Sequence, residues 1–322
     1  MSVLVYAENW DGKFKKLSFE LVSYATGVAK MLSTNITAVS IGKVEETELK
    51  KLGNYGANKI INVDNDKLNT LDNQAYTSVL SEIAQREDSR VIIIANNNTG
   101  KAIAPRLSVR LKAGIGSGVS KLPLNLIPFT VYKRTYSGNA FAHVVIKSDV
   151  KIITLAQNSF DLIETSNNAT IENLNISVDG SLIKTVVRDV QKQTGKIVLT
   201  DADIVVSGGR GMKSPDNWTS LVELATLLGA ATACSRPVSD EGWRPHEEHT
   251  GQTGKIISPN LYIAVGISGA TQHLAGISSS KYIVAINSDK DAPIFEAAQY
   301  GIVGDAMKIL PKLVEAVKVI KK

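Results

Sequence analysis

Apolar residues along positions 1–111 follow two kinds of spacing. Runs of consecutive apolar residues cover 3–7, 36–41, 59–63 and 90–95, and such runs are typical of parallel strands buried on both faces. Between them, apolar residues recur at helical spacing, which predicts helices over 17–32, 45–52, 72–85 and 102–111. Alternating strands and helices predict an α/β domain that is doubly wound, as in nucleotide-binding proteins.

The pattern changes near residue 115, where the helical spacing stops. Strand-like runs follow at 129–135, 141–147, 151–155, 169–177 and 184–190. Strands without intervening helices predict a β-rich extension of the first sheet. The stretch 191–196, Gln-Lys-Gln-Thr-Gly-Lys, contains no apolar residue and is typical of a domain boundary. We therefore expect an N-terminal α/β domain at 1–190 and a second domain at 191–322.

The last third of the chain repeats one arrangement five times. Apolar runs at 203–206, 230–234, 261–265, 282–286 and 301–303 each lead into small, polar or cationic residues. Ligands of open α/β sheets bind beyond the carboxyl ends of the strands. The five ends therefore predict one crevice, wide enough for a dinucleotide, in a Rossmann-like parallel-sheet domain. Apolar residues along one side of 307–320 predict a final helix that packs on this sheet.

Two glycine-containing segments of this domain have the composition of a ligand site. They are Gly-Gln-Thr-Gly-Lys at 251–255 and Gly-Ile-Ser-Gly-Ala-Thr-Gln-His at 266–273. Glycines let the backbone approach a ligand closely, and hydroxyl and amide side chains add hydrogen-bond donors. A helix that begins after Gly269 would aim its first N–H groups at whatever lies above the strand, so phosphate is the expected guest.

Two further segments have alternative interpretations. The run Asn-Asn-Asn-Thr-Gly at 96–100 could hold a nucleotide, or it could be a tight turn between strand and helix. His246 and His249 have the spacing of metal ligands on one face of a helix. Pro245 and the nearby glycines favour a loop instead. We therefore expect a solvated acidic loop at 246–249 and no metal site.

Composition narrows the function classes. The chain has 322 residues, and a hydrophobic content of 43% is ample for two cores. No apolar run approaches the roughly 18 residues of a membrane span, and the first residues lack the pattern of a signal or transit peptide, so we expect a cytoplasmic protein. The net charge of +5 comes from scattered lysines, which gives little support for nucleic-acid binding. The lone Cys234 excludes an internal disulfide and a thiolate zinc site.

Eight blocks of the second domain occur in the order and spacing of one family. They are 207–211, 235–237, 251–255, 261–270, 272–273, 283–287, 292–295 and 300–305. Together they closely resemble the FAD domain of the electron transfer flavoprotein alpha subunit. The first domain is similar to the same family at 5–8, 100–101 and 104–107. The resemblance therefore spans the chain and is more specific than any single glycine motif.

The resemblance implies FAD as the cofactor and gives roles to individual residues at the redox site. Thr253 is expected to hydrogen-bond flavin N5, and His273 is expected to lie by flavin O2, where negative charge collects upon reduction. Arg236 is expected to place its positive charge over the ring. Gln252 and Thr250 would flank the ring and the ribityl chain.

The same resemblance places the rest of the cofactor. The turn at 268–271 is expected to cradle the pyrophosphate, with Arg210 adding positive charge, while Asn287 and Asp305 reach the ribose and adenine. The full set of expected FAD contacts is Arg210, Ser235, Arg236, Thr250, Gly251, Gln252, Thr253, Ser268, Gly269, Ala270, Thr271, Gln272, His273, Asn287, Asp305 and Ala306.

The resemblance also implies partners. An electron transfer flavoprotein beta subunit would complete a heterodimer, with the first domain as scaffold and subunit contact. Flavin dehydrogenases such as acyl-CoA dehydrogenases would donate electrons, and a quinone oxidoreductase would accept them, so the chain would be a carrier that converts no substrate. Two alternatives stay open: an NADH-linked electron-bifurcating flavoprotein, and a regulatory module that binds a nucleotide without redox chemistry.

Overall fold

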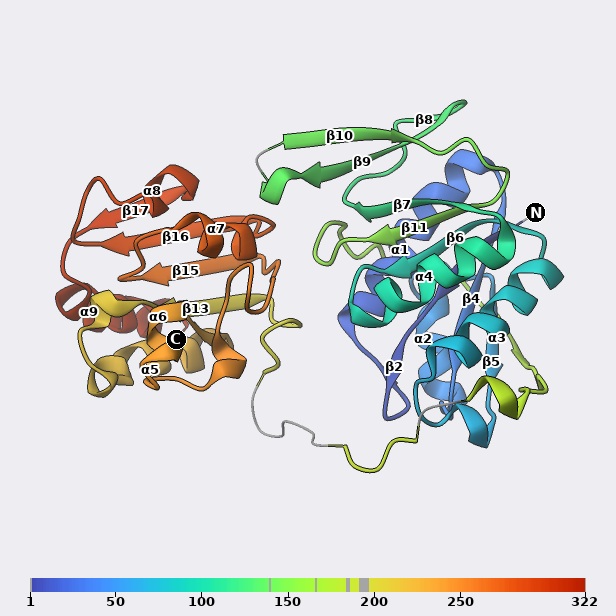
Figure 1. The fold of residues 1–322 in the computed structure, drawn as a ribbon, viewed down its shortest axis with the longest axis horizontal. Helices are drawn as coiled ribbons and strands as arrows, with labels where there is room; N and C mark the ends of the chain where they lie inside the picture. The colour runs from blue at the N-terminus through green and yellow to red at the C-terminus, as the bar shows by residue number, and fades with distance from the viewer. Residues whose placement is uncertain (1, 139, 166, 184–185, 191–196, 322) are drawn as a thin grey trace. The chain divides into compact units, whose positions relative to one another are not determined.

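The computed structural model describes residues 2–138, 140–165, 167–183, 186–190 and 197–321 of the chain. Contacts within the chain divide it into two compact units. The first unit comprises residues 1–135 and 140–190, and the second comprises 136–139 and 191–322. Each unit is built on its own sheet (Figure 1).

The first unit contains a ten-stranded sheet. Its strands are β1 (Ser2–Tyr6), β4 (Asn35–Ile41), β5 (Lys59–Val63), β6 (Ser89–Ala95), β7 (Gly114–Val119), β8 (Asn125–Leu126), β9 (Phe129–Thr135), β10 (Ala140–Val145), β11 (Lys151–Leu155) and β12 (Thr170–Asn173). They lie in the order β10-β9-β7-β11-β6-β1-β4-β5-β12, with β8 paired to β9. Strand β9 pairs antiparallel with β7, β8 and β10, and the remaining pairs are parallel. A separate two-stranded sheet joins β2 (Asn9–Trp10) and β3 (Lys13–Phe14).

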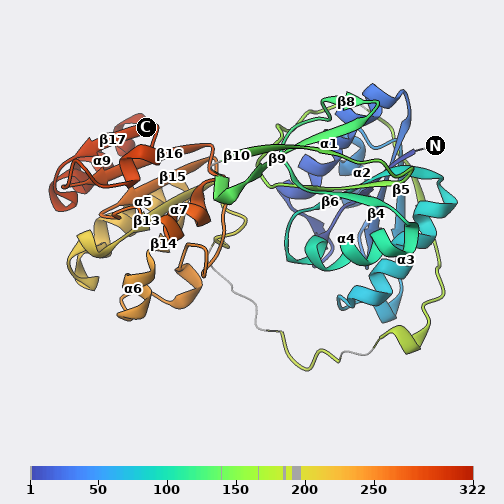
Figure 2. The same cartoon turned by 45° about the horizontal axis from the view of Figure 1, so that its top comes forward.

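Helices cover both faces of this sheet, as the alternating pattern predicted. The helices are α1 (Lys16–Leu32), α2 (Glu46–Gly53), α3 (Asn73–Arg86) and α4 (Asn98–Leu111), and the short 3-10 turns are η1 (Asp66–Leu68) and η3 (Gly180–Leu182). Because successive strand residues point to opposite faces, Val3 and Val5 pack with α1 and α2, whereas Leu4 and Tyr6 pack with α3 and α4. Figure 2 shows these two helix pairs on opposite sides of the sheet. The doubly wound α/β fold is confirmed.

The β-rich extension is confirmed, but its composition differs from the prediction. Strands β8, β9 and β10 extend the sheet, whereas β11 lies inside the parallel part, between β6 and β7. Strand β7 was not predicted, because glycines interrupt its apolar pattern; a Cβ on Gly116 would lie 2.8 Å from Val131 Cγ2. Strand β12 is shorter than the run predicted at 169–177. The strand predicted at 184–190 is wrong for 186–190, which form none, and 184–185 lie outside the described residues.

The loop between β6 and α4 is a turn whose polar groups bond within the chain. Asn97 caps α4 by accepting a hydrogen bond from the Gly100 N–H at 2.9 Å. Asn97 Nδ2 and Thr99 Oγ1 donate to the two oxygens of the Glu8 carboxylate, at 2.6 and 2.8 Å. A carboxylate therefore already lies at the N-terminus of α4, where a nucleotide phosphate would otherwise bind. Of the two interpretations of this loop, the structure favours the turn.

The second unit contains a five-stranded parallel sheet with the order β14-β13-β15-β16-β17 (Figure 1). Its strands are β13 (Ile204–Gly208), β14 (Ala231–Cys234), β15 (Leu261–Val265), β16 (Tyr282–Asn287) and β17 (Tyr300–Val303). Its helices are α5 (Thr219–Leu228), α6 (Arg236–Asp240), α7 (Thr271–Ile277), α8 (Ile294–Ala297) and α9 (Ala306–Ile320). The 3-10 turns are η2 (Tyr136–Gly138), η4 (Arg210–Met212), η5 (Pro215–Trp218) and η6 (His246–Glu248). All five predicted strands are present, as is the predicted final helix.

This sheet also separates two apolar clusters. Leu221 of α5 and Leu310 of α9 pack on the face formed by Val206, Ile263 and Ile286. The other face buries α7 and α8 against alternate residues of the same strands, including Tyr262. A Rossmann-like parallel sheet covered on both faces is therefore confirmed. Within the described ranges, no helix is long and apolar enough to cross a membrane.

Candidate functional site

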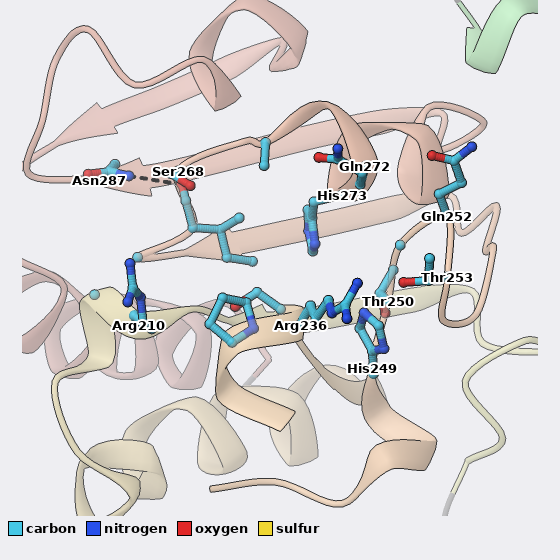
Figure 3. A pocket seen from close by; sticks show the side chains of 17 residues that line it. Arg210, Arg236, His249, Thr250, Gln252, Thr253, Ser268, Gln272, His273 and Asn287 are labelled. Carbon is cyan, nitrogen blue, oxygen red and sulfur yellow. Dashed lines mark hydrogen bonds between the residues drawn. The ribbon is translucent and has the colours of Figure 1, made fainter. Parts of the chain in front are cut away.

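A cavity of about 470 Å³ lies at the carboxyl ends of the strands in the second unit. Its lining combines the ends of β13, β14, β15 and β16 with the loop at 249–253 (Figure 3). The lining residues are Arg210, Gly211, Ser235, Arg236, Pro237, His249, Thr250, Gly251, Gln252, Thr253, Gly266, Ile267, Ser268, Ala270, Gln272, His273 and Asn287. Residues 304 and 305, which follow β17, are not among them. The crevice predicted from five strand ends is thus built from four.

Most of the residues expected to contact FAD lie in this lining. Those brought together are Arg210, Ser235, Arg236, Thr250, Gly251, Gln252, Thr253, Ser268, Ala270, Gln272, His273 and Asn287. Gly269, Thr271, Asp305 and Ala306 are not part of it. Gly269 is buried against the backbone of Ile294, where a Cβ would lie 2.2 Å from that N atom. Thr271 is the exposed first residue of α7.

Asp305 has a local structural role. Its carboxylate caps α9 by accepting from the Met307 N–H at 3.0 Å, and it pairs with Lys213 Nζ at 3.1 Å. These two contacts lower the pKa of the Asp305 carboxyl, in that order of importance. Ala306 is the buried first residue of the same helix.

Five lining residues were not among the expected FAD contacts: Gly211, Pro237, His249, Gly266 and Ile267. Four of them fall inside the blocks that carried the family resemblance. The sequence therefore indicated that these four lie near the site, although no contact with FAD was assigned to them. His249 lies outside those blocks. Its position directly before Thr250 could have indicated its place in the lining, because adjacent residues of a loop often line the same cavity.

Glycines allow the loops after β13 and β15 to meet backbone to backbone. Gly209 N–H donates to Val265 O at 2.9 Å, and Gly211 N–H donates to Gly266 O at 3.0 Å. Gly266 has a φ of +61°, and a Cβ there would lie 2.8 Å from Gly211 Cα. A side chain at Gly266 would therefore be strained and would push the two loops apart. This close approach forms one wall of the cavity.

The polar groups of the lining favour an anionic ligand. Two arginines line the cavity, and no carboxylate does. Arg236 pairs with Asp240 at 3.3 Å on an exposed surface, whereas Arg210 makes no ion pair within the described part of the chain. In the same described part, the backbone N–H groups of residues 268–272 donate no hydrogen bond. Cationic side chains beside free N–H groups suit the oxygens of a phosphate.

His273 is a buried, neutral group in this wall. Its Nε2 lies 2.9 Å from the Tyr262 hydroxyl, and its Nδ1 has no hydrogen-bond partner of ordinary geometry. Burial lowers the pKa of His273 to about 4, with the nearby Thr250 backbone opposing this effect and the charge of His249 adding to it. His273 therefore carries no charge at neutral pH. In Figure 3 its ring extends from α7 into the cavity wall.

The expectation of a solvated acidic loop at 246–249 is wrong for its second half. Glu248 and His249 are both buried. Arg244 Nε and one terminal nitrogen each donate to the Glu248 carboxylate at 2.7 Å, and the Arg244 guanidinium lies 5.1 Å from the centre of the Trp218 ring. This bidentate pair holds the segment that leads into the cavity loop. The sequence indicated this ion pair only through the spacing of Arg244, four residues before Glu248.

His249 packs beneath the turn at 251–254. A Cβ on Gly254 would lie 2.8 Å from His249 Nδ1, so this turn closes over the imidazole because Gly254 is small. Among the described residues, His249 Nδ1 has no hydrogen-bond partner. Burial, followed by the charge of His246, lowers the pKa of His249. Among the residues that the structure describes, no group of three or more His, Cys, Asp or Glu could hold a metal ion.

Cys234, at the end of β14, is fully buried and does not line the cavity. Burial raises the pKa of its thiol to about 12, with the Glu248 carboxylate adding to the effect. Only a thiolate is a strong nucleophile, so this thiol is unreactive at neutral pH.

Comparison with known proteins identifies the family. The model described as "Electron transfer flavoprotein domain" matches residues 3–179, and "Electron transfer flavoprotein FAD-binding domain" matches residues 198–278. An "Electron transfer flavoprotein subunit alpha" of Bacillus subtilis is 36% identical over 319 residues, covering 98% of this chain and 97% of the relative. The protein of that name from Syntrophomonas wolfei is 35% identical, with 98% of each chain covered.

A third relative has a different name. The "Acryloyl-CoA reductase electron transfer subunit beta" of Anaerotignum propionicum is 31% identical over 350 residues, covering 98% of this chain and 95% of the relative. The family resemblance seen in the sequence is confirmed by matches that span both units. The chain therefore belongs to the electron transfer flavoprotein alpha subunits, a family of electron carriers, and its second domain is the FAD-binding domain of that family.

Proposed function

We propose that this chain is the alpha subunit of a heterodimeric carrier that holds FAD in the cavity at the ends of β13–β16. It would take electrons from flavin dehydrogenases, such as acyl-CoA dehydrogenases, and pass them to a quinone oxidoreductase. The observation that carries this proposal is the lining itself, in which two arginines, free N–H groups and an imidazole occur without a single carboxylate.

The residues present suit FAD in charge, and the cavity has the volume of a small-molecule site. A cavity of about 470 Å³ is within the usual range of roughly 300–1,000 Å³ for small-molecule sites. The pyrophosphate of FAD is an anion, and the lining offers it Arg210 and the free N–H groups of 268–272. The close approach of Gly211 and Gly266 leaves room that a Cβ would fill. The donor set therefore fits the cofactor.

Distinct parts of the lining would hold distinct parts of the cofactor. Arg210 and the turn at 268–270 would bind the pyrophosphate, and Asn287, whose side chain is fixed by donating to Ile267 O at 2.9 Å, would bind beside it. Thr253 and His273 would hold the ring from the opposite end of the cavity (Figure 3). Bound FAD supplies a ring that accepts and releases electrons one at a time.

Arg236 would act on that ring through its charge. The side chain is exposed, and its single ion pair, to Asp240, is also exposed, so that contact removes little of the positive charge. A fixed positive charge beside a ring that becomes negative favours the reduced form. The neutral His273 adds a polar contact without a second charge.

The partner assignment follows from the relatives. The close relatives are named as alpha subunits, which supports a beta subunit as the second chain. The relative named as an electron transfer subunit of acryloyl-CoA reductase supports an alternative, in which an NADH-linked, electron-bifurcating complex delivers electrons to a reductase. The two alternatives differ in the electron donor.

The cofactor proposal is tested by co-expressing the chain with a beta subunit from the same genome and recording the visible spectrum. We expect a yellow heterodimer with the absorption bands of bound flavin. Arg210→Ala should weaken FAD binding about tenfold, because a charge-assisted contact to phosphate is worth about 1.4 kcal/mol or more. Arg110→Ala, on helix α4 of the first unit, is the matched control. A protein that stays colourless in saturating FAD would overturn the proposal.

The donor is tested separately by reducing the purified heterodimer anaerobically. An acyl-CoA dehydrogenase with its substrate should bleach the flavin within seconds, whereas NADH alone should not. Bleaching by NADH, with simultaneous reduction of a low-potential acceptor, would instead support the bifurcating alternative.

A further inference from the structure

Tyr262 contacts His273 from the interior of the sheet. Tyr262 lies on β15, is fully buried, and places its hydroxyl 2.9 Å from His273 Nε2. This is the one side-chain hydrogen bond that the His273 ring makes within the described part of the chain. His273 lines the cavity and Tyr262 does not, so the hydrogen bond to His273 is a polar route by which Tyr262 can affect a bound molecule.

The acceptors near the Tyr262 hydroxyl indicate which of the two groups, Tyr262 or His273, donates the hydrogen bond between them. Burial raises the pKa of Tyr262 far above neutrality, so the hydroxyl keeps its proton and needs an acceptor for it. Ser207 Oγ on β13 faces the same side of the sheet and lowers the pKa of Tyr262, as a hydroxyl that donates toward the phenol oxygen would, but it makes no hydrogen bond of ordinary geometry within the described residues. Nε2 is then the remaining acceptor, and an accepting Nε2 carries no proton.

We propose that Tyr262 is a positioning residue that holds His273 in its Nδ1–H tautomer. A neutral imidazole has one proton, so a hydroxyl that donates to Nε2 places the ring proton on Nδ1. Nδ1–H then faces the backbone of Thr250, whose influence on His273 is already apparent. His273 would thereby connect the core of β15 with the loop that carries Gln252 and Thr253.

The surroundings of the pair preserve this arrangement. The charged or titratable groups near it are His249, whose positive charge would oppose protonation of His273, the protonated thiol of Cys234, and Arg236 in the cavity wall. None of the three is hydrogen-bonded to the Tyr262 hydroxyl within the described residues. The tautomer therefore depends on the Tyr262 hydrogen bond at Nε2 and on the Thr250 backbone beside the ring. Its consequence for FAD rests on the proposed function, whereas the tautomer itself does not.

The test reads the tautomer directly. The full-length chain, with histidines labelled with ¹⁵N, has four imidazoles, and His273→Gln identifies the signals of His273. We expect a protonated Nδ1 and an unprotonated, hydrogen-bonded Nε2 in the unaltered chain, both without FAD and with FAD bound. Tyr262→Phe should shift Nε2 away from the hydrogen-bonded position. Tyr282→Phe, an exposed tyrosine on the neighbouring strand, should change nothing.

A second variant, Ser207→Ala, keeps the proposal falsifiable if Tyr262→Phe fails to fold. Ser207→Ala should leave the Nδ1–H signature unchanged, and a proton on Nε2 in either Ser207→Ala or the unaltered chain would overturn the proposal. Where Tyr262→Phe does fold, FAD should bind about fivefold more weakly, as expected for one lost buried hydrogen bond. Unchanged His273 signals in that variant would refute the role of Tyr262. Failure to bind FAD at all would instead refute the proposed function and leave the tautomer result standing.

Discussion

Lowering the pH from 7 to 4 should destabilise the second domain through His273. This imidazole is buried, and its pKa of about 4 lies below the ordinary value of 6.5. As the pH falls, the unfolded chain binds the proton first, because its histidine is solvated. The stabilising contribution is therefore complete above pH 6.5 and is lost between pH 6.5 and 4.

The magnitude follows from that difference in pKa. One pKa unit corresponds to about 1.4 kcal/mol, so a pKa lowered from 6.5 to about 4 means that the free energy of unfolding falls by about 3 kcal/mol between neutral pH and pH 4. A loss of this size is a large fraction of the roughly 5–15 kcal/mol that stabilises a typical domain. His249 has a lowered pKa as well and should add to the loss in the same direction.

The assay is denaturant unfolding of the FAD-free chain at several pH values between 7 and 4. A Trp10→Phe background removes the exposed tryptophan of the first unit, so that fluorescence reports on the buried Trp218 and its neighbour Trp243. In this background, His273→Gln should reduce the dependence of unfolding free energy on pH. His143→Gln, at an exposed position of β10 in the first unit, is the control.

The slope, and not the stability at any one pH, decides the outcome, because His273→Gln also changes packing and so shifts the whole curve. Equal slopes for His273→Gln and the unaltered chain between pH 6.5 and 4 would refute the reasoning. A slope that disappears with His143→Gln would refute it too, since that residue lies in the other unit.

Three other changes test separate parts of the site. Arg236→Gln should lower the potential of the first electron added to bound FAD by tens of millivolts, on the order of 1 kcal/mol for one solvated charge near the ring; spectroelectrochemistry with no shift would contradict this role. Glu248→Gln should lower the unfolding free energy by about 2 kcal/mol, because it leaves Arg244 without its bidentate partner. Equal denaturation midpoints for this variant and the unaltered chain would argue against a stabilising pair. Gly266→Ala should abolish FAD binding, whereas Gly229→Ala, which also has a positive φ but open space around it, should cost stability and spare binding measured by flavin fluorescence.

The sequence pattern predicted the fold where burial coincided with apolar runs. Strands β9 and β11 have the predicted bounds, because their apolar residues lie in the core. The strand predicted at 184–190 is wrong for residues 186–190, where Val186, Val187 and Val190 are exposed. Apolar residues form a strand of a sheet only where a neighbouring strand is available to pair with them. Strand β7 was not predicted because its glycines break the apolar pattern. Glycine backbone can still pair in a sheet without an apolar side chain.

The candidate site was predictable to the extent that its residues lie within continuous motifs. Asp305 lies outside the lining, and local spacing did not reveal this because its partner Lys213 is distant in sequence. Burial of Glu248 and His249 depends on how Arg244 packs over a tryptophan, which the local sequence does not reveal. Side-chain pairing across a fold is set by tertiary packing, and spacing alone does not encode it.

The inertness of Cys234 makes this chain a convenient host for spectroscopic probes. It is the one cysteine in the sequence, and it is shielded from solvent, with a thiol that stays protonated at neutral pH. Maleimide reagents attack thiolates and should therefore leave the folded native chain unmodified. An engineered cysteine on an exposed face of each unit would carry a fluorophore or spin label without background. Inter-unit distances would then become measurable while the chain exchanges electrons with its donors and acceptors.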